Sequence, residues 1–258
     1  MMTKRCLKKI IMQNFQNSKI PVVILAGGKG SRIIEYTKAI PKPLIRVNRV
    51  PILIRIINHY ISYGFEDFII ATGYLHNVID KYFYNNYKKK NNEYSYNQNV
   101  KVKLVFTGLK TMTGGRVLRL KKYLLKKNKK FCLTYGDGLS DINLSKLLIF
   151  HKKHKKIATL TTVRPPARFG YLKLKKDQVL QFGEKKNVDA GWINGGFFIF
   201  NEKIFNYIYN DNTYLERDPL ENLATNKQLK AFKHYGFWQC MDTLRDKLYL
   251  DDYFKKNK

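Results

Sequence analysis

Cysteine is scarce in this chain, and long apolar runs are missing. The 258 residues include three cysteines, which are far apart and form no C-x-x-C pair: Cys6, Cys132 and Cys240. A disulfide framework is therefore not expected, and a reducing cytoplasm is the predicted compartment. No apolar stretch reaches the length of a membrane span, so no membrane partner is expected. Residues 1–19 lack the apolar core of a signal peptide, and we interpret them as a tail before one domain at 20–258.

Acidic side chains are also few. The chain has 49 Lys and Arg but only 19 Asp and Glu, a formal net charge of +30. Such a charge attracts polyanions, including nucleic acid and phosphorylated substrates. Most of the excess is lysine, and asparagine, isoleucine and tyrosine are abundant as well, which is the set that AT-rich codons encode. A solvated lysine surface is therefore favoured, no nucleic-acid partner is expected, and a non-catalytic basic nucleic-acid-binding protein is kept as an alternative.

Several familiar catalytic motifs are absent. The chain contains no Walker A loop, no G-x-G-x-x-G, no G-x-S-x-G elbow and no H-E-x-x-H. His151 and His154 share one face of a predicted helix, but no nearby ligands complete a zinc site, and we expect both at the surface. Covalent catalysis by a serine nucleophile and zinc hydrolysis therefore find no support.

Apolar strands alternate with amphipathic helices in the first half of the chain. Strands are predicted at residues 21–26, 67–72, 101–106 and 131–135, and helices at 52–61, 75–83 and 114–125. This alternation is typical of βαβ units and predicts an α/β fold with a mainly parallel, mixed sheet flanked by helices. The polar residues 85–99 are expected to form a loop.

The second half of the chain adds shorter elements. Strands are predicted at 158–163, 171–174, 179–182 and 196–200, and helices near 144–148, 202–209, 216–226 and 244–250. The strands at 171–174 and 179–182 are interpreted as a hairpin, a small β elaboration. Ligands of parallel sheets bind beyond the carboxyl ends of the strands, so functional residues are sought directly after each apolar run.

A glycine-rich segment, residues 25–32 (LAGGKGSR), follows the first predicted strand. Glycine lets the backbone turn tightly and approach a ligand closely. Successive backbone N–H groups can then form a nest for phosphate oxygens. An ordinary strand-to-helix turn is the alternative for this segment taken alone.

One lysine lies between two prolines in Pro41-Lys42-Pro43. Proline fixes its own φ and restricts the preceding residue, so Lys42 lies on a stiff, extended segment. Such a segment suits a charge that must point in one direction. A rigid surface turn with a solvated lysine is the alternative.

Two aspartates are candidate metal ligands. Asp137 ends an apolar strand between two glycines, which leaves room for a metal and a phosphate chain, and Asp242 precedes a predicted C-terminal helix. Mg²⁺ in proteins typically takes one or two carboxylates, several waters and substrate phosphates. An Asp-Gly hairpin turn is the alternative for Asp137, and a helix N-cap is the alternative for Asp242.

Together these segments resemble the nucleotidyltransferase family that activates sugar phosphates. The glycine-rich segment followed by Pro41-Lys42-Pro43-Leu44 carries the resemblance. Further segments are similar to the glucose-1-phosphate cytidylyltransferase branch: residues 112–116 (MTGGR), 134–138 (TYGDG), 168–170 (RFG), 194–198 (NGGFF) and 237–247 (FWQCMDTLRDK). The similarity runs from about Val22 to near the C-terminus, so it covers most of the chain.

The resemblance implies a Rossmann-like nucleotidyltransferase fold for residues 20–258. It also implies Mg²⁺-dependent transfer of a nucleotidyl group from CTP to glucose 1-phosphate, giving CDP-glucose and pyrophosphate for bacterial surface polysaccharide (O-antigen). Family members often form homo-oligomers. The attacking phosphate is already an anion, so the protein must position two polyanions and neutralise their repulsion, and it needs no general base.

The expected roles follow from that chemistry. The catalytic residues are Arg32, Lys42 and Asp137. The nucleotide-binding residues are Leu25, Ala26, Gly27, Gly28, Gly30, Ser31, Arg32, Lys42, Thr111, Thr113, Gly114, Gly115 and Gly136. The sugar-phosphate-binding residues are Gly170, Glu184, Lys185, Asn194 and Gly195. The Mg²⁺ ligands are Asp137 and Asp242.

Three departures from the family pattern leave alternatives open. Ser31 replaces the usual threonine, Lys186 follows Glu184-Lys185 where proline is usual, and the region from about 85 to 108 is shorter than in typical cytidylyltransferases. The same chemistry with UTP, dTTP or GTP, or with another sugar 1-phosphate, is one alternative. A relative that binds sugar nucleotides without turnover is another.

Overall fold

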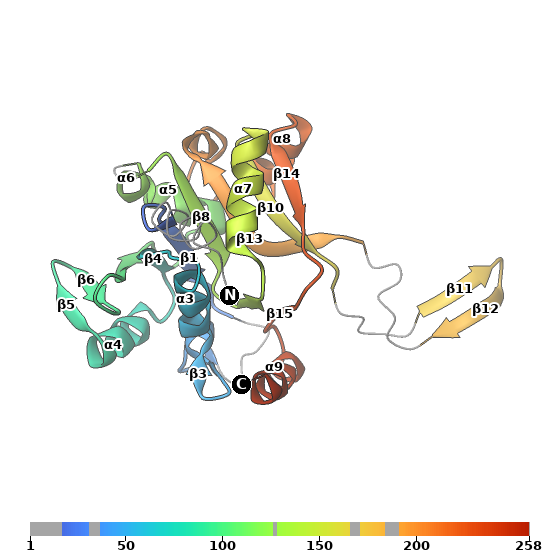
Figure 1. The fold of residues 1–258 in the computed structure, drawn as a ribbon, viewed down its shortest axis with the longest axis horizontal. Helices are drawn as coiled ribbons and strands as arrows, with labels where there is room; N and C mark the ends of the chain where they lie inside the picture. Colours follow the sequence, from blue (N-terminus) through green and yellow to red (C-terminus); the bar gives the residue numbers. More distant parts are fainter. Residues whose placement is uncertain (1–16, 31–36, 126–127, 166–170, 184–190, 258) are drawn as a thin grey trace, which may run out of the picture.

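A nine-stranded mixed sheet forms the centre of the computed structural model, which describes residues 17–30, 37–125, 128–165, 171–183 and 191–257 (Figure 1). The strand order is β14-β10-β13-β8-β1-β4-β7-β6-β5. The bounds are β1 (Val22–Ala26), β4 (Asp67–Thr72), β5 (Lys88–Lys90), β6 (Glu93–Ser95), β7 (Lys101–Phe106), β8 (Lys130–Tyr135), β10 (Ala158–Val163), β13 (Ile193–Asn201) and β14 (Leu229–Lys233).

The four central strands, β8, β1, β4 and β7, are parallel to one another. Outside them, β13 runs antiparallel to both β8 and β10, and the β5–β6 hairpin adds antiparallel pairs at the other edge. The expected mixed sheet is confirmed, with its parallel part concentrated in the middle. The carboxyl ends of β1, β4, β7 and β8 consequently meet at one edge of the sheet.

Helices cover both faces of the sheet. The longer ones are α3 (Ile52–Ile61), α4 (His76–Asn86), α7 (Leu144–His154), α8 (Asp218–Thr225) and α9 (Leu244–Lys256). Shorter elements are α5 (Thr113–Arg119), α6 (Lys121–Leu124), and the 3₁₀ helices η2 (Lys42–Leu44) and η3 (Glu202–Tyr207). Short strands pair as β2 (Arg46–Val47) with β3 (Val50–Pro51) and as β9 (Gly138–Ser140) with β15 (Trp238–Cys240).

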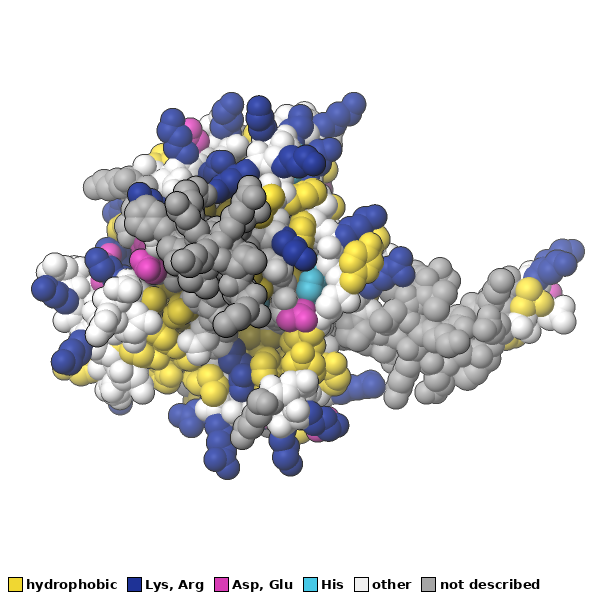
Figure 2. All heavy atoms as spheres, in the orientation of Figure 1, with side chains coloured by type: hydrophobic (Ala, Val, Ile, Leu, Met, Phe, Trp, Pro, Cys, Tyr) yellow, Lys and Arg dark blue, Asp and Glu magenta, His cyan; other side chains and the backbone are white. Residues whose placement is uncertain are grey.

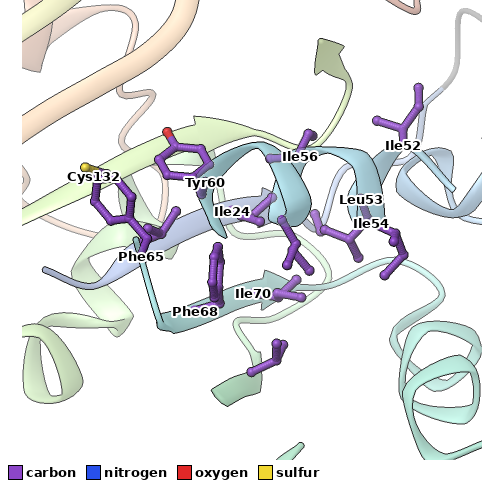
Figure 3. Close-up of a cluster of buried hydrophobic side chains, with 14 of the residues drawn as sticks. Ile24, Ile52, Leu53, Ile54, Ile56, Tyr60, Phe65, Phe68, Ile70 and Cys132 are labelled. Carbon is purple, nitrogen blue, oxygen red and sulfur yellow. The ribbon is translucent and has the colours of Figure 1, made fainter. Parts of the chain in front are cut away.

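The core consists of two layers that share the strand β1. Val22 and Ile24 face one layer, where α3 packs across β1 and β4 (Figure 3). Val23 and Leu25 face the other layer, beneath α5, α6 and α8. Side chains alternate between the faces of a strand, so a strand covered on both faces is apolar throughout. This explains the unbroken apolar run that predicted β1.

Most predicted elements are confirmed, and three predictions needed correction. The expected loop at 85–99 contains the β5–β6 hairpin, whose turn residues Asn91 and Asn92 adopt φ values of 50° and 60°. Asparagine tolerates this left-handed conformation, so Asn-Asn can close a tight hairpin without glycine. The helix predicted at 114–125 is divided at Leu120 into α5 and α6. The segment near 202–209 is a 3₁₀ helix.

The predicted hairpin is β11 (Tyr171–Lys175) with β12 (Gln178–Gly183), which lies apart from the main sheet in Figure 1. The expected tail lies mostly outside the described residues, but Asn17 is buried and donates a hydrogen bond to the Tyr63 carbonyl. Among the described residues, no helix is both long and apolar enough to cross a bilayer. Lys and Arg side chains are scattered over the face in Figure 2 and do not form one patch.

Candidate active site

A cavity of about 590 Å³ opens at the carboxyl ends of β1 and β8. It brings together most of the residues that the sequence predicts for binding. These are Leu25, Ala26, Gly27, Gly28, Gly30, Lys42, Thr111, Thr113, Gly136, Asp137, Asn194, Gly195 and Asp242. Of the other predicted residues, Gly114 and Gly115 are described but do not line the cavity, and Ser31, Arg32, Gly170, Glu184 and Lys185 lie outside the described part of the chain.

Lys42 lies between the two predicted metal ligands. Its ammonium nitrogen is 2.7 Å from Oδ2 of Asp137 and 2.8 Å from Oδ1 of Asp242. Pro41 is extended (φ −62°, ψ 140°), and the chain then turns into η2 with Lys42 as its first residue. The lysine is therefore not on a solvated surface turn, because its side chain is only 11% exposed.

The electrostatics of Lys42 favour its charged form. Burial lowers the pKa of its ammonium, but the charges and hydrogen bonds of Asp137 and Asp242 outweigh burial, so the net pKa lies above the usual value. Charge-assisted hydrogen bonds of this kind are short and strong. Lys42 is therefore a permanent cation inside the cavity at neutral pH.

A short antiparallel pair of strands brings the two aspartates together. Asp137 directly precedes β9, whose partner β15 ends just before Asp242. The Met241 N–H donates to the Asp137 carbonyl at 2.9 Å, which fixes the two segments in register. The N-cap of α9 is Thr243, which forms a capping box with Asp246, so Asp242 is not the cap. Its carboxylate instead accepts a hydrogen bond from Lys42.

These carboxylates fit a divalent cation. Both lie within 2.8 Å of the Lys42 ammonium nitrogen, so the two carboxylates converge on one part of the cavity. Within the described residues no cluster of three or more His, Cys, Asp and Glu side chains could hold a metal. Two carboxylates are nevertheless enough for Mg²⁺, because substrate phosphates and water supply the other ligands.

Arg116 is a cavity residue that the sequence did not single out. Its guanidinium is buried and donates to the carbonyls of Gly27, Thr72 and Gly108 and to the hydroxyl of Thr107. Those acceptors lie at the ends of β1, β4 and β7, so one side chain ties three strand ends together. Burial, and to a lesser degree Arg119, lowers the pKa of Arg116. Only its place in the similar segment 112–116 could have indicated it.

Two of the predicted nucleotide-binding glycines have a different position. Gly114 and Gly115 do not line the cavity, since both N–H groups donate to the Thr213 carbonyl, at 2.9 and 3.2 Å. A β-carbon on Gly115 would lie 2.5 Å from the Asp211 backbone. These glycines therefore allow the loop before α8 to pack closely on α5, and their contact with a nucleotide stays a prediction.

A chain of hydrogen bonds lines the wall between the predicted nucleotide and sugar residues. The hydroxyls of Thr113 and Tyr135 donate to the two carboxylate oxygens of Glu216, at 2.5 and 2.6 Å. Asn194 donates from Nδ2 to the Tyr135 hydroxyl at 3.3 Å. Burial raises the pKa of Tyr135, and the neighbouring Glu216 charge raises it further. The Tyr135 hydroxyl thus keeps its proton.

The two histidines without a predicted partner are not both at the surface. His151 is only 2% exposed, and its Nδ1 is 2.8 Å from the Thr159 hydroxyl. His154 places Nε2 2.7 Å from the same oxygen. The surface expectation for His151 is therefore wrong, because its face of α7 packs on β10. Neither histidine lines the cavity.

The fold and the site define the class of protein. A sequence model described as nucleotidyl transferase matches residues 21–240, and the chain belongs to this family. Within the family, the chain is similar to the glucose-1-phosphate cytidylyltransferase of Salmonella typhimurium, with 44% identity over 248 residues, covering 92% of this chain and 96% of that protein. A Bacillus subtilis protein named "Probable glucose-1-phosphate cytidylyltransferase" is 39% identical over 239 residues, 88% of this chain and 92% of that protein.

Solved structures agree on the fold. The crystal structure of HddC from Yersinia pseudotuberculosis matches with a TM-score of 0.70 and 24% identity, covering 91% of this chain and 99% of that one. At 24% identity, this comparison supports a shared fold and no shared function. The predicted Rossmann-like nucleotidyltransferase fold is confirmed.

Proposed function

We propose that this protein transfers a cytidylyl group from CTP to glucose 1-phosphate, in the presence of Mg²⁺, and releases CDP-glucose and pyrophosphate. In the cell the product would supply a sugar for surface polysaccharide such as O-antigen. The observation that carries the proposal is the Lys42 ammonium held between Asp137 and Asp242 in the cavity. The 44% identity to a protein named for this reaction supports the choice of substrates.

The residues of the cavity suit a reaction between two phosphate groups. Lys42 and Arg116 are fixed cations that can neutralise the repulsion between two polyanions. Backbone N–H groups of the glycine-rich segment can hold a triphosphate. Electrostatic stabilisation by such preorganised groups is usually the largest contribution to catalysis of phosphoryl-type transfer.

Asp137 and Asp242 would hold the divalent cation, which when bound supplies charge neutralisation at the substrate phosphates. Lys42 donates hydrogen bonds to both carboxylates and so orients them toward the same point. Both aspartates lie next to the paired strands β9 and β15, which sets their relative position. Positioning of this kind lowers the barrier of the reaction, because the substrates have already lost their translational freedom when they bind.

A panel of four triphosphates tests the proposal directly. Purified protein is mixed with glucose 1-phosphate, Mg²⁺ and CTP, UTP, dTTP or GTP, and pyrophosphate release is followed. We expect CTP to give the highest kcat/KM and EDTA to abolish turnover. Lys42→Gln should be inactive, and Lys38→Gln, which removes an exposed lysine four residues earlier, should behave like the wild type.

The other candidates give different results. A higher kcat/KM with UTP, dTTP or GTP, or with another sugar 1-phosphate, would replace CTP and glucose in the proposal. A sugar-nucleotide binder without turnover would bind CTP but release no pyrophosphate. A nucleic-acid-binding protein would bind duplex DNA tightly, with an affinity that falls steeply as salt rises. The expected homo-oligomer stays a prediction that size-exclusion chromatography with light scattering can test.

A further inference from the structure

Glu216 connects the two sides of the cavity, although it is not among the cavity-lining residues. It lies in the loop before α8, and each of its carboxylate oxygens accepts one hydroxyl hydrogen bond. One comes from Thr113 at the start of α5, and the other comes from Tyr135 at the end of β8. Both donors line the cavity.

The chemistry of the carboxylate fixes the direction of these bonds. An ionised carboxylate can only accept, so both hydroxyl hydrogens must point to Glu216. The oxygen of Thr113 also accepts from the Leu215 N–H at 2.9 Å, and the oxygen of Tyr135 accepts from Asn194. Neither hydroxyl has a hydrogen left to offer to the cavity. Each oxygen can therefore act toward a ligand only as an acceptor.

An ion pair does not account for the position of the Glu216 carboxylate. Across the part of the chain that the structure describes, no salt bridge joins its carboxylate to Lys or Arg, despite the net charge of +30. Arg217, the next residue, instead stacks on the ring of Tyr214. The hydrogen bonds of Glu216 are thus directed at two neutral hydroxyls of the cavity wall.

We propose that Glu216 is a positioning residue that turns the Thr113 and Tyr135 hydroxyls into acceptors, so that this wall selects a substrate group that donates a hydrogen bond. The inference rests on the proposed nucleotidyl transfer. The donor is an exocyclic amino group of the base, a ribose hydroxyl or a hexose hydroxyl, since Thr113 belongs to the predicted nucleotide set and Asn194 to the predicted sugar set. A site built to pair with such a donor rejects an analogue that lacks it.

Glu216→Gln tests the proposal with little change in shape. The glutamine amide donates from its nitrogen, so one of the two hydroxyls must turn its hydrogen toward the cavity. The matched control is Glu221→Gln, which makes the same charge change at an exposed position in α8. Thermal unfolding of all variants identifies any that are not folded.

The substrate pairs separate the three donor sources. For each variant, kcat/KM is measured with CTP and with UTP, which lacks the 4-amino donor, and with dCTP, which lacks the 2′-hydroxyl. A set of monodeoxy glucose 1-phosphates tests the hexose. In Glu216→Gln we expect the discrimination against one of these analogues to shrink about tenfold, which corresponds to one hydrogen bond to the substrate. Glu221→Gln should retain the wild-type ratios.

The outcomes either support or overturn the role of Glu216. If Glu216→Gln lowers kcat/KM by the same factor for every substrate, or changes no ratio, the residue is only structural and the inference is wrong. Wild-type turnover in the triphosphate panel tests the proposed function separately, and without turnover the same ratios are measured as Kd values. If Glu216→Gln does not fold, Thr113→Val and Tyr135→Phe must show the loss of discrimination instead.

Discussion

The Arg116 guanidinium occupies the space next to Gly27 that a side chain at residue 27 would fill. A β-carbon at this position would overlap the guanidinium. The guanidinium is held there by a hydrogen bond from its Nη2 to the Gly27 carbonyl, at 3.0 Å. Gly73 makes room on the other side, since a β-carbon there would lie 2.5 Å from Nη1. The first glycine of the LAGGKGSR segment therefore makes room for a buried arginine, in addition to the ligand contact predicted for it.

Gly27→Ala should destabilise the protein, because the added methyl group must displace Arg116. Overpacking of this kind costs about 1–3 kcal/mol, which for a chain of this size lowers Tm by roughly 2–12 °C. Gly28→Ala is the matched control for stability, because no atom of the described residues lies within 4 Å of a β-carbon built on Gly28. Thermal unfolding of both variants provides the measurement. Equal Tm values for the two would contradict the packing account.

Arg116→Lys should lose activity while keeping its charge. The planar guanidinium donates to four acceptors, which are three backbone carbonyls and the Thr107 hydroxyl. A lysine ammonium has only three donors, on a flexible stem. At least one buried acceptor would remain unpaired, which costs about 1–3 kcal/mol. We expect kcat/KM to fall by about 10- to 100-fold. Arg119→Lys, at an exposed ion pair with Asp211, is the control and should stay near the wild-type value.

The periodicity of the sequence predicted the central sheet well for a physical reason. β1 is buried on both faces and apolar throughout, β4 is apolar between its end residues Asp67 and Thr72, and the helix α3 between them shows one apolar face. The candidate site followed from the rule that ligands bind where parallel strands end. Asp137 and Lys42 could be selected because each has an unusual local setting, between glycines or between prolines.

The parts that sequence could not predict depend on long-range partners. β9 and β15 are three residues each, and they pair across about 100 residues of chain, so neither has a periodic pattern of its own. Arg116 resembles any helical arginine until the three strand ends around it are assembled. Glu216 lies on an exposed loop, and only the fold brings it to Tyr135. Local patterns contain no information on such contacts.

Asp137→Ala should lower the catalytic rate by on the order of 10²–10³, because it removes a preorganised carboxylate of the proposed metal site. Asp242→Asn should act in the same direction and raise the Mg²⁺ concentration needed for half-maximal rate. Asp252→Asn, which alters only a surface pair with Lys256, is the control. The test is a Mg²⁺ titration of kcat for each variant. Near-normal turnover of Asp137→Ala would remove this residue from the metal site.

His151 should make the protein less stable in acid. Burial, then His154 and Lys130, lowers its pKa from 6.5 to about 3. Between those values the unfolded chain binds a proton that the folded chain does not, so stability falls as pH decreases from about 6.5 toward 3. The loss between pH 7 and pH 4 should be on the order of 3 kcal/mol.

His151→Gln removes the titrating group, so its free energy of unfolding should be lower than that of the wild type at pH 7 but should fall less between pH 7 and pH 4. His76→Gln is the control, because His76 also lies within hydrogen-bond distance of a threonine hydroxyl, that of Thr72. Urea unfolding at several pH values gives the free energies. Parallel pH curves for the wild type and His151→Gln would show that another group causes the acid sensitivity, since titration of the His151 imidazole makes the two curves converge.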